Sequence, residues 1–173
     1  VFAGGSESCD WCGSSLFDAM GVLPANFNDN PTAASRPFDK DRSGFVLSEG
    51  GGIVVVEELE RAISRGAPIY GEILGYATNC DGGYSMVAPS TQGQIECVEA
   101  AFADAGISPN EIDYVNTHGT STEVGDPSEI AALNTIFTEH KPMMSSTKSQ
   151  IGHTIGGAGA IELIAATLML KNS

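Results

Sequence analysis

The sequence predicts an α/β protein in which helices cover a largely parallel or mixed sheet. Strand-like and helix-like segments alternate along most of the chain, and this order is typical of layered α/β folds. Apolar residues make up 42% of the 173 residues, which is an ordinary share for a globular protein and argues against disorder. The length is sufficient for one domain with a sizeable core.

The first third of the chain is predicted to contain two strands, one helix and a long loop. Residues 1–5 are apolar and then glycine-rich, which indicates the end of a strand, and residues 9–20 have apolar side chains at helical spacing. Residues 26–45 are rich in Asn, Asp, Pro and charged side chains and are expected to form a loop. Three glycines at 50–52 predict a close backbone approach, and the β-branched run 53–56 predicts a strand buried on both faces.

The rest of the chain alternates between helices and strands. Helices are expected at residues 57–65, 91–105, 127–137 and 155–170. Strands are expected at residues 69–78, 112–115 and 143–147. Ser90 or Thr91 is the predicted cap of the second of these helices, and Gly106 is expected to end it.

His118 is the first candidate functional residue. The strand 112–115 leads into a polar turn that contains His118, and Asp126 and Pro127 then open the next helix, with Asp126 as the predicted N-cap. Open α/β sheets bind their ligands at the carboxyl ends of strands. A histidine at this place, among small hydroxyl residues, can face a ligand.

His153 has the same context as His118, because it follows a strand and is flanked by glycine and threonine. Two parallel strands would bring both histidines to one edge of the sheet, with Lys148 at the end of the second strand. Two neutral imidazoles can donate hydrogen bonds to one developing oxyanion. Lys148, paired with a carboxylate such as Glu129 or Asp126, would fix this geometry and keep a histidine neutral.

Other interpretations of these residues stay open at this point. His118 and His153 could both be structural, or could bind zinc together with Asp126 or Glu129, although the spacing matches no familiar zinc motif. The glycines at 152–159 could form a phosphate cradle, but they match no phosphate-binding motif, and tight helix packing is favoured. His140 lies at a polar helix end and is expected to be solvated.

Charge and cysteine content exclude some classes of partner. Lys and Arg total 8 against 22 Asp and Glu, a net charge of −14, which argues against nucleic acid or an anionic membrane as a partner. The four cysteines suit a reduced, cytoplasmic compartment. Cys9 and Cys12 have CxxC spacing without a second pair, so ordinary packing cysteines are favoured over a redox pair.

Two segments resemble the histidine motifs of the β-ketoacyl-[acyl carrier protein] synthases. They are residues 116–126 around His118 and residues 148–159 around His153. Residues 17–21, 36–46 and 50–58 are also similar to this family, and within it to synthase I of bacterial type II fatty-acid synthesis.

The resemblance implies a thiolase-like fold of α-β-α-β-α layers, of which this chain is an incomplete portion centred on the second half. Residues 1–50 would be the end of the first half with its connecting loops. Residues 51–173 would be the bulk of the second half, without its C-terminus.

The resemblance also implies a decarboxylative Claisen condensation between an acyl-enzyme thioester and malonyl-[acyl carrier protein]. His118 and His153 would stabilise the thioester oxyanion, Lys148 would be the active-site lysine and Glu129 its carboxylate partner. The implied substrate-binding residues are Thr120 and Thr122, on the phosphopantetheine arm, and Phe45, near the active site. No cofactor or metal is implied, and acyl carrier protein and a second copy of the chain are the implied partners, in the cytoplasm.

The nucleophile of the family is a cysteine in the first half, in a Cys-Ser or Cys-Ala context at a helix N-terminus. None of Cys9, Cys12, Cys80 and Cys97 has this context. The 173-residue chain alone is therefore expected to be inactive. The alternative is a non-catalytic subunit similar to a chain-length factor, but such subunits need not keep both histidines, and both are present here.

Overall fold

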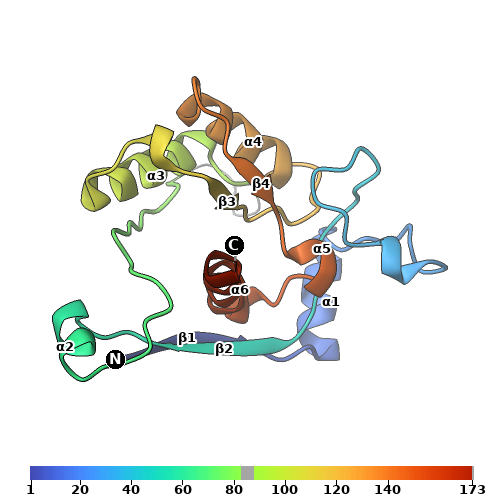
Figure 1. Ribbon diagram of the computed structural model, residues 1–173. Helices are drawn as coiled ribbons and strands as arrows, with labels where there is room; N and C mark the ends of the chain where they lie inside the picture. Colours follow the sequence, from blue (N-terminus) through green and yellow to red (C-terminus); the bar gives the residue numbers. More distant parts are fainter. Residues whose placement is uncertain (83–87, 173) are drawn as a thin grey trace.

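The computed structural model describes residues 1–82 and 88–172, which form four layers in the order sheet, helix, sheet, helices (Figure 1). The first sheet contains β1 (Phe2–Glu7) and β2 (Gly50–Val55), and the second contains β3 (Tyr114–Asn116) and β4 (Met143–Ser145). Figure 1 shows α6 (Ala158–Asn172) between the two sheets, and α3 (Thr91–Ala105) and α4 (Gly125–Ile136) beyond the second sheet. These layers correspond to four of the five that the family resemblance implies.

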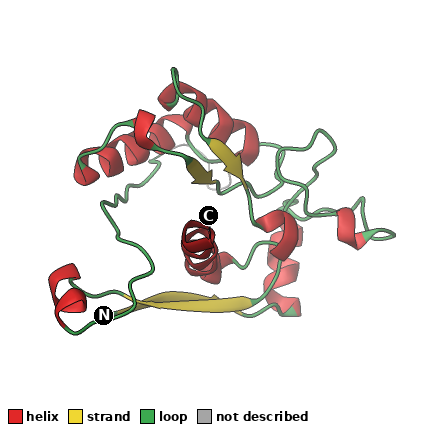
Figure 2. Cartoon of the chain, viewed as in Figure 1, coloured by secondary structure: helices red, strands yellow, loops and turns green. Residues whose placement is uncertain are grey.

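The alternation of strands and helices alone predicts one largely parallel or mixed sheet, whereas the layers implied by the family resemblance contain two sheets, and the structure has two. β1 and β2 are antiparallel, with Phe2 opposite Val55 and Glu7 opposite Gly50, whereas β3 and β4 are parallel, with Tyr114 opposite Met143. Within the described residues the strands form two separate sheets of two strands each (Figure 2). Alternation along the sequence indicates which segments are strands but does not specify which strands pair.

The glycines of β2 allow α6 to approach the first sheet closely, as the sequence predicts. A Cβ on Gly52 would lie 2.9 Å from Ile164 Cδ1 and 3.2 Å from the backbone of Ala160. The other face of β2 is open, because Ile53 is 70% and Val55 68% exposed. The prediction that this strand is buried on both faces is therefore wrong for the described structure, where α6 covers one face only.

The helices form near their predicted positions. Ser90 caps α3 by accepting a hydrogen bond from Gly93 N, and Gly106 ends it in the left-handed conformation at φ 68°. Phe102 of α3 and Phe137 after α4 pack edge to face, with ring centroids 6.2 Å apart. The remaining helices are α1 (Trp11–Ala19), α2 (Leu59–Ser64) and α5 (Lys148–Ile151), with 3-10 turns at Pro31–Ala33, Pro109–Glu111 and Ile155–Gly157.

Residues 69–78 do not form the predicted strand. This segment has no regular secondary structure, and some of its backbone groups bond to side chains of α3: Tyr76 N donates to Asp104 Oδ2 at 3.0 Å, and Cys97 Sγ donates to Ala77 O at 3.5 Å. The strand predicted from the alternating side chains is therefore wrong. Across the described residues, no helix is long and apolar enough to cross a membrane.

Candidate active site

His118 follows β3 in a loop that the carboxylate of Glu129 holds from α4. The backbone N–H groups of His118 and Gly119 donate to the two oxygens of Glu129 at 2.6 and 2.7 Å. Thr117 anchors the other side of the loop, because its N and Oγ1 both donate to Ser145 O of β4. Burial raises the pKa of Glu129, and the two backbone hydrogen bonds act in the opposite direction by stabilising the carboxylate.

His153 is held by a bridge to the segment before β2. Its backbone N donates to Val46 O at 2.8 Å, and its carbonyl accepts from Ser48 N at 3.1 Å. The ring Nδ1 accepts a hydrogen bond from Ile155 N at 3.2 Å. The neutral imidazole therefore carries its proton on Nε2, which leaves that N–H free to act as a donor.

The two histidine rings lie against each other, as the sequence predicts. Their centroids are 5.1 Å apart and their planes meet at 85°. Burial, together with smaller effects of His118 and Lys148, lowers the pKa of His153 to about 4. Partial burial and the charge of Lys148 also lower the pKa of His118, although part of this residue remains exposed. Both rings are consequently neutral near pH 7.

Lys148 is completely buried and pairs with Glu162, not with Glu129 or Asp126. Its Nζ lies 2.5 Å from Glu162 Oε1, and Thr147 Oγ1 donates to the same oxygen at 3.0 Å. The exposed fraction of the lysine side chain is 1%. The predicted pairing with Glu129 is wrong, because both oxygens of that carboxylate are bound to the His118 loop. Lys148 also begins α5 and does not lie within β4.

Asp126 is not the N-cap of α4, which begins at Gly125 after Val124. Its buried carboxylate instead accepts backbone N–H groups from Phe38 at 2.7 Å and from Ser121 at 3.1 Å. Both of these residues have positive φ, 64° and 71°, a region that is unfavourable for side chains with a Cβ. Asp126 therefore ties the loop after His118 to the long loop before β2 and holds both in strained conformations.

The predicted substrate-binding residues lie beside the histidines. The Thr120 and Thr122 hydroxyls share a hydrogen bond of 2.9 Å, and Thr122 Oγ1 also accepts from Gly125 N. Phe45 is buried and packs edge to face on His153 at 5.2 Å and on Phe17 of α1 at 5.3 Å. Phe45 thus links α1 to the histidine pair.

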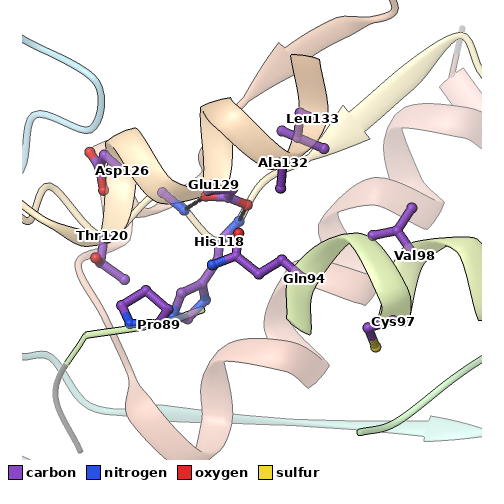
Figure 3. A pocket seen from close by; sticks show the side chains of 12 residues that line it. Pro89, Gln94, Cys97, Val98, His118, Thr120, Asp126, Glu129, Ala132 and Leu133 are labelled. Atoms are coloured by element: carbon purple, nitrogen blue, oxygen red, sulfur yellow. Dashed lines mark hydrogen bonds between the residues drawn. The ribbon is translucent and has the colours of Figure 1, made fainter. Parts of the chain in front are cut away.

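A pocket of about 380 Å³ opens beside His118, between α3 and α4 (Figure 3). Its lining residues are Pro89, Gln94, Cys97, Val98, His118, Gly119, Thr120, Gly125, Asp126, Glu129, Ala132 and Leu133. Apolar side chains of α3 and α4 form the wall farthest from Thr120, while polar groups gather near His118 (Figure 3). A ligand in this pocket would reach the His118 ring.

The sequence did not identify Glu162 as the partner of Lys148 or Gln94 as a residue that lines the pocket. Glu162 is the only acidic residue in the apolar segment 158–172, and a lone carboxylate within such a helix is itself a signal for a buried charged partner. His140 was expected to be solvated, but it is half-buried and its Nε2 lies 2.8 Å from Ile112 O.

The described part of the chain supports neither a metal site at the histidines nor a redox pair formed by Cys9 and Cys12. There, no group of three or more His, Cys, Asp and Glu side chains is placed to hold a metal ion. The carboxylates of Asp126 and Glu129 are instead bound to backbone N–H groups. Cys9 and Cys12 are free and exposed, so the prediction that they pack in the interior is wrong for this structure.

Comparison with known sequences covers almost the whole chain. Residues 1–62 match the N-terminal domain of β-ketoacyl synthases, and residues 70–173 match the C-terminal domain. The chain is 50% identical over 172 residues to 3-oxoacyl-[acyl-carrier-protein] synthase 1 of Haemophilus influenzae and 49% identical to that of Escherichia coli K12. Each alignment covers 99% of this chain but only 41% of the relative.

Solved structures show the same similarity. A β-ketoacyl synthase from Burkholderia phymatum has a TM-score of 0.94 and 39% identity, over 99% of this chain and 41% of the solved chain. A type II polyketide ketosynthase, solved in complex with its acyl-carrier protein and bound to the hexaketide, also has a TM-score of 0.94, with 36% identity over 98% of this chain and 43% of that one.

Proposed function

Because the chain belongs to the β-ketoacyl synthase family and has its thiolase-like fold, we propose that it forms part of a condensing enzyme. The reaction is the decarboxylative Claisen condensation of an acyl-enzyme thioester with malonyl-[acyl carrier protein]. The observation that carries this proposal is the pair of neutral imidazoles, His118 and His153, with ring centroids 5.1 Å apart.

The proposed chemistry uses the N–H of each imidazole. When the malonyl thioester loses its carboxylate as CO₂, the electron pair of the broken C–C bond forms an enolate whose oxygen accepts hydrogen bonds from His118 and His153. The enolate carbon then attacks the carbonyl of the acyl-enzyme thioester, and the enzyme sulfur leaves as a thiolate. Neutral donors in a partly buried site stabilise the enolate without a proton transfer.

The remaining residues of the site position this pair. Glu129 holds the backbone of the His118 loop, and Ile155 N fixes the tautomer of His153. The ammonium group of Lys148, neutralised by Glu162, contributes to the lowered pKa of both histidines. In this proposal the phosphopantetheine arm of the carrier protein passes Thr120 and Thr122, and the protein needs no cofactor or metal of its own.

The proposed nucleophile is a cysteine outside this chain, so the 173 residues alone should not condense substrates. Cys12 lies in the first turn of α1, but Gly13 follows it in place of the Ser or Ala of the family. A homodimer in the cytoplasm is the proposed assembly, and large exposed apolar side chains such as Phe2, Trp11 and Ile53 suit burial against further protein surface. The presence of both histidines favours a catalytic subunit over a chain-length factor.

The test is decarboxylation of malonyl-[acyl carrier protein] by the full-length protein that carries this chain. His118→Ala or His153→Ala should each reduce the rate by about 100-fold or more, as the loss of an oxyanion donor does. His140→Ala is the matched control, because that histidine bonds to Ile112 O outside the site, and its rate should be unchanged. Full decarboxylation by both variants would disprove the assigned role.

A further inference from the structure

Gln94 of α3 places an unpaired amide oxygen in the pocket beside His118. Its Oε1 is buried, and it accepts no hydrogen bond within the described structure. Figure 3 shows the side chain extending from α3 into the pocket toward His118. A buried acceptor without a donor is unfavourable, so its presence in a pocket indicates a ligand that supplies the donor.

The neighbours of Gln94 determine which end of its amide faces the pocket. Ser128 Oγ has a single hydrogen and two acceptors nearer than Gln94, Thr91 Oγ1 at 2.8 Å and Pro89 O at 3.3 Å, so it accepts from Gln94. Gln94 Nε2 lies 3.4 Å from this oxygen and is therefore the end turned toward Ser128. Oε1 is left as the free end, and the pocket presents an acceptor and not a second donor.

The surroundings favour a neutral N–H donor over a cation. The oxygens of Glu129 and Asp126, which also line the pocket, are bound to backbone N–H groups. Burial is the main cause that lowers the pKa of His118, and the same removal from water disfavours a positive charge on a ligand beside it. An amide N–H satisfies Oε1 without adding charge.

We propose that Gln94 is a specificity-determining residue whose Oε1 accepts a hydrogen bond from an amide N–H of the thioester arm that brings the malonyl group to His118 and His153. This inference rests on the proposed function. Thr120, which lines the same pocket, belongs to the threonine pair already assigned to that arm. Gln94 would add a contact that recognises the amide itself.

The test compares malonyl pantetheine with two analogues, in each of which one amide N–H of the arm is replaced by an ester oxygen. The enzyme is the full-length protein carrying this chain, and the measurement is kcat/KM for decarboxylation. For one of the two analogues the wild-type protein should be about tenfold less active than with the amide, which corresponds to about 1.4 kcal/mol. In Gln94→Ala the values of kcat/KM with the amide and with the ester should be about equal, because no acceptor remains to distinguish the two.

Two further variants make the result specific. Gln94→Met keeps the length of the side chain without the acceptor and should also lose the preference, so a poorly folding alanine variant does not decide the outcome. Gln92→Ala is the matched control, since Gln92 is exposed on the same helix and bonds to Glu96; it should keep the full preference.

The outcomes separate this inference from the proposed function. If the wild-type protein decarboxylates neither malonyl pantetheine nor malonyl-[acyl carrier protein], the proposed function fails. If it is active but the amide preference is the same with and without Gln94, the inference on Gln94 is wrong and the proposed function stands. An equal loss of activity on amide and ester substrates in Gln94→Ala would also overturn it, since Gln94 would then act on His118 and not on the ligand.

Discussion

Replacing Glu162 by Gln should destabilise the protein strongly, because it removes the countercharge of a buried lysine. The Lys148 side chain is 1% exposed, and its Nζ is 2.5 Å from Glu162 Oε1. In Glu162→Gln the ammonium group keeps an amide oxygen as an acceptor but loses the charge that offsets its removal from water. Glutamine has nearly the same shape as glutamate, so packing changes little.

The magnitude follows from charge separation and burial. At an effective dielectric constant of about 20, two unit charges 2.5 Å apart attract each other by about 7 kcal/mol, and desolvation offsets a large part of this. Loss of one partner of a buried pair costs about 3–5 kcal/mol, and the retained acceptor places Glu162→Gln at the lower end, about 3 kcal/mol. The measurement is the urea unfolding midpoint of the chain, followed by far-ultraviolet circular dichroism.

Two further variants test the reasoning. In the double variant Lys148→Met, Glu162→Leu both charges are removed together, so most of the lost stability should return. Lys141→Met is the control for the lysine substitution, because Lys141 is exposed and bonds to the neutral side chain of Asn134; the change should stay within about 0.5 kcal/mol. A loss below about 1 kcal/mol in Glu162→Gln, or a double variant no more stable than the single one, would refute the argument.

Two more predictions concern the His118–His153 site. The pKa of His153 is about 4 in the folded protein and 6.5 for an ordinary histidine, so the unfolded state binds a proton more readily. The free energy of unfolding is therefore highest above pH 6.5 and decreases as the pH falls toward 4. With an allowance for the partial exposure of His153, the free energy of unfolding should decrease by about 2 kcal/mol over this pH range, and by less in His153→Asn. An equal pH slope in the two proteins would contradict the lowered pKa of His153. Gly119→Ala should destabilise by about 2 kcal/mol in urea titrations, because φ is +35° and a Cβ would lie 2.7 Å from Ser146 Cβ. Gly159→Ala, where no atom lies within 4 Å, should be neutral or stabilising, and equal losses at both positions would refute the steric argument.

The candidate site shows what a local pattern can predict. The sequence predicts that each histidine follows a strand and precedes a helix, and this context places His118 and His153 together, although in the structure α5 lies between β4 and His153. The same kind of reasoning paired Lys148 with a carboxylate such as Glu129 or Asp126, and the family resemblance implied Glu129; both pairings are wrong. A carboxylate one helical turn into α4 can reach either the loop before it or a distant ammonium group, and only the fold shows that the backbone of His118 takes both oxygens.

The strands show a corresponding limit. Alternating side chains made residues 69–78 appear to be a strand, but a strand requires a neighbour that bonds to its backbone, and Asp104 and Cys97 of α3 take part of that role. Likewise, the β-branched run after Gly52 predicted burial on both faces. Ile53 is 70% exposed, because α6 covers only the opposite face in the described structure.

The sequence by itself determined the class of fold, the positions of most helices, the histidine pair and the family resemblance. All of these depend on residue types at short spacing, which local propensity, capping and motif order can express. The tertiary structure decided the pairing of strands, the partner of Lys148 and the free oxygen of Gln94. Those features depend on contacts between segments far apart in the chain: Lys148 and Glu162 are 14 positions apart, and Gln94 and Ser128 are 34 positions apart.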